Sequence, residues 1–224
     1  MPDTLKVPHT PKVIAIDGPA GSGKSTVARA VAARLGLAYL DTGAMYRAVA
    51  FEAMRRGIEP DDEQTVAELS RQLELEVGEK VMVNGTDATV EIRSPEVTRA
   101  VSSVAANPAV RKEMVLRQRE WAARRGGGVV EGRDIGTVVF PQAPLKVYLT
   151  ASEDERASRR TKEMLDRDYD RVAADMARRD QIDSTRAASP LTVAADAVEL
   201  DTTGLDAEAV VDAVMALIAE RVPQ

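Results

Sequence analysis

Short runs of apolar residues alternate along the chain with longer segments in which apolar residues recur at helical spacing. Residues 13–16 (Val-Ile-Ala-Ile) predict a buried strand that ends at Asp17-Gly18. Residues 25–35 predict a helix that stops at Gly36. The same two patterns predict further strands at 37–40, 129–130, 146–149 and 197–200, and helices at 44–56, 95–106, 108–124 and 206–222. This alternation favours an α/β fold, a five-stranded parallel sheet with helices on both faces.

Residues 63–93 break this alternation. A short acidic helix leads into alternating apolar and charged residues over 73–77, the pair Asn84-Gly85 favours a tight hairpin turn, and Val90 and Ile92 continue the alternation. We interpret 63–93 as a small antiparallel β insert in a domain that spans 12–224. The proline-flanked residues 1–11 are expected to form a flexible tail.

Composition excludes several classes of function. The chain has no cysteine, and its one histidine, His9, lies in the N-terminal tail, so thiolate and histidine metal sites and a Ser-His-Asp triad are excluded. There is no run of 18 apolar residues and no apolar leader, so we expect a cytoplasmic protein with no membrane partner. The net charge of −6 argues against a nucleic-acid partner.

Residues 18–25 (Gly-Pro-Ala-Gly-Ser-Gly-Lys-Ser) match the phosphate-binding pattern G-x-x-x-x-G-K-[ST] between a predicted strand and a predicted helix. The domain is therefore expected to be of the P-loop NTPase type. Lys24 would reach the β and γ phosphates, and the Ser25 hydroxyl would ligate Mg²⁺. The tetrapeptide Asn-Lys-x-Asp of guanine-specific switches is absent, which favours a small-molecule kinase. The expected ATP-binding residues are Gly18, Pro19, Ala20, Gly21, Ser22, Gly23, Lys24, Ser25 and Thr26.

Two further loops follow predicted core strands. Because ligands in open α/β sheets lie beyond the carboxyl ends of the strands, both loops are expected at the site. In residues 41–47, Thr42 is placed as a helix N-cap and Arg47 lies about one turn into the helix. In residues 131–136, two glycines bracket Arg133 and Asp134. The structural alternatives are a capped helix with a surface arginine for the first loop and an ion-paired turn for the second.

Residues 151–186 are highly charged. The pairs Glu155–Arg159, Glu163–Arg167 and Asp175–Arg179 have i,i+4 spacing, which is typical of a solvated helix. The alternative is a helical lid that excludes water from the transferred phosphoryl group and brings cationic side chains to it. In favour of a lid, Arg156 and Arg160 share one helical face, as do Arg179, Asp183 and Arg186.

Together these motifs resemble the bacterial cytidylate kinases of the long type, which carry an inserted subdomain and belong to the P-loop nucleoside monophosphate kinases. The resemblance runs from about residue 13 to the closing helix and rests on residues 16–26, 41–47, 99–111, 131–141 and 178–186. It implies transfer of phosphoryl from ATP to CMP, and to dCMP, by a monomer that uses Mg²⁺. The alternatives are a P-loop kinase for another nucleoside monophosphate or metabolite and, more remotely, a nucleotide-binding module without enzymatic activity.

The resemblance also implies roles for individual residues. Catalytic roles fall to Lys24, Arg133, Arg156 and Arg160, the last two as lid arginines. Thr42, where many members have serine, and Arg47 would hold the acceptor. Its phosphate would meet Arg47, Arg133 and Arg186, its cytosine Ser102, Arg111 and Asp134, and its sugar hydroxyls Arg179 and Asp183. The carboxylate that orients Mg²⁺ stays open, with Asp17 and Asp134 as candidates.

Overall fold

The computed structural model describes residues 12–163 and 168–222, and the predicted N-terminal tail lies outside these ranges. Its main sheet has the order β2-β6-β1-β7-β8 with every pair parallel. The strands are β1 (Lys12–Asp17), β2 (Tyr39–Asp41), β6 (Gly127–Gly132), β7 (Leu145–Thr150) and β8 (Val198–Asp201). The predicted five-stranded parallel sheet is confirmed, with strand ends shifted by one or two residues.

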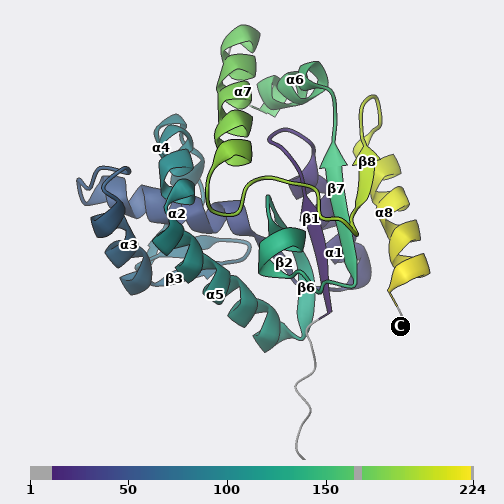
Figure 1. The fold of residues 1–224 in the computed structure, drawn as a ribbon, viewed down its shortest axis with the longest axis horizontal. Helices are drawn as coiled ribbons and strands as arrows, with labels where there is room; N and C mark the ends of the chain where they lie inside the picture. Colours follow the sequence, from purple (N-terminus) through teal and green to yellow (C-terminus); the bar gives the residue numbers. More distant parts are fainter. Residues whose placement is uncertain (1–11, 164–167, 223–224) are drawn as a thin grey trace, which may run out of the picture.

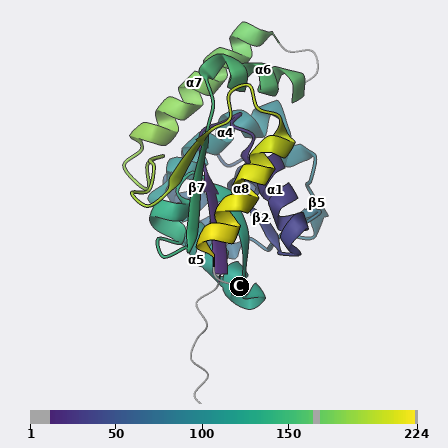
Figure 2. The ribbon, with the colours of Figure 1, turned by 90° about the vertical axis from the view of Figure 1, so that its right-hand side faces the viewer.

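Helices cover both faces of this sheet (Figures 1 and 2). Helices α1 (Lys24–Leu35) and α8 (Ala207–Arg221) cover one face, and α2 (Thr42–Arg55), α3 (Glu63–Gln72), α4 (Pro95–Ala106) and α5 (Pro108–Arg125) lie on the other. Strand β1 shows why: Ile14 and Ile16 pack into the first core, whereas Val13 and Ala15 pack into the second. No helix within the described ranges is both long and apolar enough to cross a membrane.

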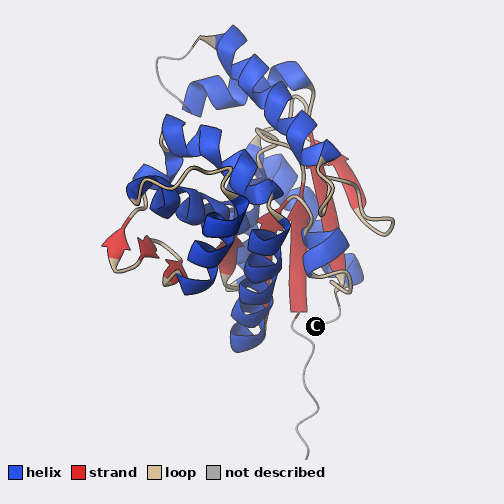
Figure 3. Cartoon of the chain, turned by 60° about the vertical axis from the view of Figure 1, so that its left-hand side comes forward, coloured by secondary structure: helices blue, strands red, loops and turns tan. Residues whose placement is uncertain are grey.

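The insert forms a separate three-stranded antiparallel sheet, whose short strands lie away from the main sheet in Figure 3. It comprises β3 (Leu75–Val77), β4 (Val81–Val83) and β5 (Thr86–Asp87). Asn84 and Gly85 have φ of 46° and 76°, as the predicted tight turn requires. The Asn84 amide also donates to Glu52 of α2 over 2.8 Å, which ties the hairpin to the main domain.

The predicted strand alternation at Val90 and Ile92 is wrong. Strand pairing stops at Asp87, whose carboxylate accepts hydrogen bonds from the backbone and hydroxyl of Thr89 and so turns the chain. The chain then forms a 3₁₀ turn, η1 (Glu91–Arg93), in which Ile92 is fully buried while Val90 is exposed. A single buried residue in a helical turn produces the same local pattern as one member of an alternating strand.

Two helices stand above the carboxyl ends of the strands, α6 (Glu153–Glu163) and α7 (Tyr169–Thr185), as Figure 1 shows. They pack against each other, and α7 also contacts α4. Of the three predicted i,i+4 pairs, Glu155–Arg159 forms at 3.0 Å, and Arg179 lies nearer Asp183, at 4.0 Å. The pair Glu163–Arg167 lies outside the described residues.

Candidate active site

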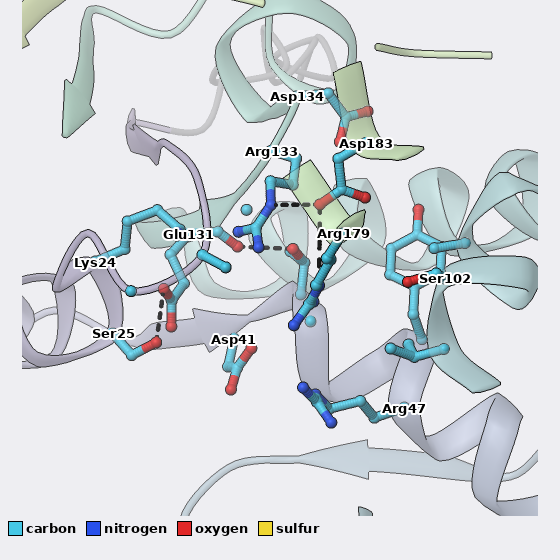
Figure 4. Close-up of a pocket in the computed structure, with 18 of the residues that line it drawn as sticks. Lys24, Ser25, Asp41, Arg47, Ser102, Glu131, Arg133, Asp134, Arg179 and Asp183 are labelled. Atoms are coloured by element: carbon cyan, nitrogen blue, oxygen red, sulfur yellow. Dashed lines mark hydrogen bonds and ion pairs between the residues drawn. The ribbon is translucent and has the colours of Figure 1, made fainter. Parts of the chain in front are cut away.

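A pocket opens where the carboxyl ends of β1, β2 and β6 meet the two upper helices. Many of the predicted site residues line it (Figure 4). They are Ala20, Gly21, Lys24, Ser25, Thr42, Arg47, Ser102, Arg111, Arg133, Asp134, Arg160, Arg179, Asp183 and Arg186. Of the other predicted residues, Gly18, Pro19, Ser22, Gly23, Thr26 and Arg156 lie outside this lining.

The P-loop has the backbone that its glycines permit. Gly18 has φ of 149°, and a Cβ there would lie 2.0 Å from the carbonyl oxygen of Leu149. Gly23 caps α1 with φ of 83°. Lys24 is folded over its own loop, donating to the carbonyl oxygen of Pro19 over 2.7 Å. Burial, and then the charge of Arg133, lowers the pKa of Lys24, so an anionic ligand beside it would restore the charged form.

Glu131, at the end of β6, is the functional candidate that the sequence analysis missed. Its Oε2 accepts a hydrogen bond from the Ser25 hydroxyl over 2.9 Å, and its Oε1 accepts one from Tyr39. Burial, and then the nearby charge of Asp41, raises the pKa of Glu131. One signal was available: an acidic residue at the end of a strand that pairs with the strand leading into the P-loop.

The two carboxylates considered for Mg²⁺ have other partners. Asp17 accepts backbone hydrogen bonds from Ile135 (2.9 Å) and Gly136 (2.7 Å), and burial raises its pKa to about 6. It therefore holds the π-helical turn η2 (Ile135–Val139) against β1. Asp134 forms a buried ion pair with Arg111. Glu131, and neither of these two, contacts Ser25.

The predicted N-cap at Thr42 is wrong by one residue. Asp41 caps α2, since its Oδ1 accepts the backbone N–H of Ala44 over 2.9 Å. Thr42 is inside the helix, and its hydroxyl donates to the carbonyl oxygen of Glu131 over 2.7 Å. A carboxylate and a hydroxyl are both good caps, so the sequence alone did not separate them.

One end of the pocket is cationic. Arg47 is buried and donates to the carbonyl oxygen of Ile92 (3.2 Å) and the hydroxyl of Thr98 (2.8 Å). Burial, and then the charges of Arg179 and Arg160, lowers the pKa of Arg47 to about 9. Cations gathered this closely repel one another, so this end suits an anion such as a phosphate group.

The other end of the pocket combines an aromatic ring with paired charges. Arg111 lies over the ring of Tyr46, 5.4 Å from its centroid, donates to the carbonyl oxygen of Ala105 over 3.1 Å and is ion-paired with Asp134. Arg186 lies here too, 3.7 Å from Asp134. Two buried nitrogens, Nε of Arg111 and Nη2 of Arg186, have no hydrogen-bond partner. Buried donors of this kind indicate a polar ligand.

Asp183 connects the two ends. It accepts a hydrogen bond from Arg133 over 2.9 Å and lies 3.5 Å from Arg186 and 4.0 Å from Arg179 (Figure 4). The shared helical face expected for Arg179, Asp183 and Arg186 is thus directed into the pocket. Ser102, on α4, also lines the pocket.

Arg156 lies outside the lining of the pocket and binds the backbone of the P-loop instead. Its guanidinium donates to the carbonyl oxygen of Ala20 over 3.1 Å and is paired with Asp180, whose Oδ1 accepts the backbone N–H of Ala20 over 3.2 Å. The two upper helices therefore hold both polar groups of one P-loop residue. Asp180 was not singled out from the sequence, since nothing in a charged helix distinguishes it from its neighbours.

Comparison with known proteins gives consistent matches. A family model described as cytidylate kinase matches residues 14–220. A cytidylate kinase of a Geobacillus species is 50% identical over 93% of this chain and 97% of the relative. One of Mycobacterium leprae is 49% identical over 93% and 96%. A bifunctional pantoate ligase/cytidylate kinase of Parasynechococcus marenigrum is 50% identical over 95% of this chain but 44% of its own length, so the chain spans about half of that relative.

Solved structures support the fold. An uncharacterised Eubacterium ventriosum protein superimposes with a TM-score of 0.51 at 12% identity, covering 93% of this chain and 99% of its own. A Thermus thermophilus protein does so with a TM-score of 0.50 at 20% identity, covering 96% and 99%.

Proposed function

The chain belongs to the cytidylate kinase family, a family of nucleoside monophosphate kinases, and on that premise we propose that it transfers the γ-phosphoryl group of ATP to CMP, giving ADP and CDP. The observation that carries the proposal is a single pocket with a P-loop, a cationic end and an end where Arg111 and Asp134 offer a donor and an acceptor side by side. We propose dCMP as a second acceptor.

The chemistry requires little covalent work from the protein. An oxygen of the CMP phosphate is already a nucleophile and attacks the γ-phosphorus of ATP; the bond from that phosphorus to the β-phosphate oxygen breaks, and ADP leaves. Residues 18–26 would bind the ATP phosphates, with Lys24 neutralising charge between β and γ. Arg47, Arg133 and the lid arginine Arg160 would align and neutralise the acceptor and the transferred group.

The residues that recognise the acceptor are proposed by matching their hydrogen-bond donors and acceptors to those of CMP. Cytosine presents an N4 amine beside the N3 and O2 acceptors. Asp134 and Ser102 would accept from the amine, and Arg111 would donate to the ring. Arg179 and Asp183 would meet the sugar hydroxyls. Since Arg186 lies with Asp134 and Arg111, we propose that it acts at the base end more than at the phosphate expected for it from the resemblance.

Mg²⁺ fits the residues present. The Ser25 hydroxyl and the Glu131 carboxylate, 2.9 Å apart, are both hard oxygen ligands, and Mg²⁺ in kinase sites takes few protein ligands beside phosphates and water. We propose that Ser25 ligates the ion and that Glu131 orients it, directly or through water. Bound there, Mg²⁺ would neutralise charge on the ATP phosphates.

We also propose the boundaries of the domain, its location in the cell and its oligomeric state. Residues 12–224 would form one kinase domain, with 63–93 as its insert and 151–186, including Arg156 and Arg160, as its lid. We further propose that the enzyme acts in the cytoplasm as a monomer, without nucleic-acid or membrane partners. The absence of a membrane-spanning helix in the described ranges is consistent with the absence of a membrane partner, and the net charge of −6 argues against a nucleic-acid partner.

The test is an ADP-release assay with ATP, Mg²⁺ and a panel of nucleoside monophosphates. We expect the highest kcat/KM for CMP, with dCMP next, lower values for UMP, and the lowest for purine monophosphates. A clear preference for another acceptor would leave the kinase class standing and replace the substrate by the alternative P-loop kinase. ATP binding without turnover of any acceptor would favour the nucleotide-binding module.

A further inference from the structure

The insert ends in a turn that delivers a charged side chain to the pocket. Arg93, the last residue of η1, lines the pocket, and its Nη2 lies 2.9 Å from Oδ2 of Asp41. Its side chain is 51% exposed, whereas that of Asp41 is 13% exposed. Arg93 therefore reaches from the insert across to the acceptor loop and stays accessible to a ligand.

The position of this turn is fixed from both sides. Ile92 is fully buried in the core, and its carbonyl oxygen accepts a hydrogen bond from Arg47 over 3.2 Å. Arg47 and Arg93 are thus attached to the same short turn. On the far side of the insert, the Asn84 amide donates to the buried Glu52 carboxylate over 2.8 Å. The insert is consequently held at two points on α2, the helix that carries Arg47.

Charge at this end of the pocket is unbalanced in favour of cations. The charges of Arg179, Arg160 and Arg93 all act to lower the pKa of Arg47, whereas Asp41 opposes them. Asp41 is already engaged, because its Oδ1 caps α2 through the backbone N–H of Ala44. A dianionic phosphate would supply the missing negative charge. The contact with Asp41 uses one hydrogen of Nη2 of Arg93, so the other Nη2 hydrogen and the hydrogens of Nε and Nη1 remain as donors for that anion.

We propose that Arg93 binds the 5′-phosphate of the acceptor nucleotide, so that the insert supplies one wall of the acceptor site. The inference rests on the proposed function, since it takes the acceptor to be a nucleoside monophosphate. Asp41 keeps its bond to one hydrogen of Nη2 and orients the guanidinium. The second Nη2 hydrogen and a neighbouring N–H on the free edge meet two phosphate oxygens in the bidentate geometry that arginine favours. The base and the sugar lie beyond its contacts.

The experiment compares CMP with cytidine, which lacks the phosphate, by calorimetric binding to the full-length chain. Arg93→Gln is expected to weaken CMP binding about ten- to a hundredfold, the range for a hydrogen bond to a charged group, and to leave cytidine binding unchanged. Arg93→Lys keeps the positive charge but loses the two parallel N–H donors of the guanidinium. Its affinity for CMP should lie between those of wild type and Arg93→Gln. Arg99→Gln is the matched control: Arg99 is an exposed arginine on α4 paired with Glu96, and both ligands should bind that variant as they bind wild type.

Each other outcome is decisive. Equal weakening of CMP and cytidine in Arg93→Gln would mean that Arg93 only holds the turn in place, and unchanged CMP binding would mean that it has no role in binding; both overturn the inference. Asp41→Asn keeps a side-chain oxygen for the cap of α2 and removes the charge that holds Arg93, so it should weaken the binding of CMP but not that of cytidine; equal weakening of both ligands would show that Asp41 acts only through the cap. If wild type binds a different nucleoside monophosphate in place of CMP, the proposed function fails. The role of Arg93 is then tested by comparing the binding of that monophosphate with the binding of its nucleoside in Arg93→Gln.

Discussion

The Ser25 hydroxyl donates to Oε2 of Glu131 over 2.9 Å, which joins the first turn of α1 to the end of β6. The two residues are 106 positions apart in the sequence, and the parallel pairing of β1 with β6 brings them together. The contact places a buried carboxylate beside the hydroxyl expected to bind Mg²⁺. A substitution of Glu131 can therefore test whether this carboxylate supports the binding of Mg²⁺.

Glu131→Gln keeps the size of the side chain and removes its charge. We expect the Mg²⁺ concentration for half-maximal activity to rise roughly tenfold or more, as for loss of a group that supports a metal ligand. The measurement is kcat at saturating ATP across a Mg²⁺ titration. Glu199→Gln, at an exposed position of β8, is the control. An unchanged Mg²⁺ requirement would leave Glu131 with only the role of holding Ser25 and Tyr39.

Lys24→Ala tests the P-loop. Lys24 is buried and is the lysine of the phosphate-binding motif, so its loss removes a charge directed at the developing charge of the transferred group. We expect kcat to fall on the order of 10²–10³-fold with the thermal unfolding midpoint nearly unchanged. Lys112→Ala, at an exposed site on α5, should retain wild-type turnover. Near-normal turnover of Lys24→Ala would remove the P-loop from the mechanism.

Arg111→Met tests the choice of base. Arg111 would donate to cytosine, which accepts at N3, whereas uracil carries a hydrogen there. We expect the ratio of kcat/KM for CMP over UMP to fall about ten- to a hundredfold, mainly through loss of CMP activity. Arg124→Met lies on the same helix at an exposed position and should keep the ratio. An unchanged ratio in Arg111→Met would place the base pocket elsewhere.

The two lid arginines should behave differently. Arg160 lines the pocket, and we expect Arg160→Ala to lower kcat on the order of 10³-fold with little change in the KM for CMP. Arg156 contacts Ala20 and Asp180, so Arg156→Ala should also loosen the lid and speed its cleavage by trypsin. Equal trypsin sensitivity in both variants would contradict this division.

Asp17 gives a pH dependence of stability. Burial raises its pKa from 3.8 to about 6, so the folded chain holds this proton more tightly than the unfolded chain. Its stabilising contribution is complete below about pH 3.8 and is lost as the pH rises through about 6, for a total of about 3 kcal/mol. The free energy of unfolding of wild type minus that of Asp17→Asn should therefore fall between pH 4 and pH 7 in urea titrations. A constant difference would show that the hydrogen bonds from Ile135 and Gly136 outweigh burial.

The sequence predicted what local pattern controls. The strand–loop–helix at the P-loop, the turn at Asn84-Gly85 and the five parallel strands follow from residue type and spacing, and the structure has them. Prediction from sequence failed where two neighbouring residues can fill the same local role: Asp41 and Thr42 are both good N-caps, and Asp41 caps the helix. Ile92 shows a second limit, because one buried residue fits both a strand and a 3₁₀ turn.

Contacts between distant segments were beyond prediction for a different reason. Glu131 meets Ser25 and Asp180 meets Ala20 only after the sheet has formed and the upper helices have docked. Whether a charged side chain in 151–186 faces water or the pocket depends on that docking. Arg156 and Arg160 therefore looked alike in the sequence and lie in different surroundings in the structure.

Gly21 lies where the P-loop meets the two upper helices. A Cβ at this position would come within 2.7 Å of the carbonyl oxygen of Arg156 and of the Cε of Met176, and its φ is 72°. The Cβ of an alanine at this position would clash with the backbone of α6, which cannot move aside as a flexible side chain can. Gly21→Ala should accordingly hold the two upper helices away from the P-loop, which gives crystallographers a way to capture a form with these helices displaced and inhibitor screens a pocket of different shape.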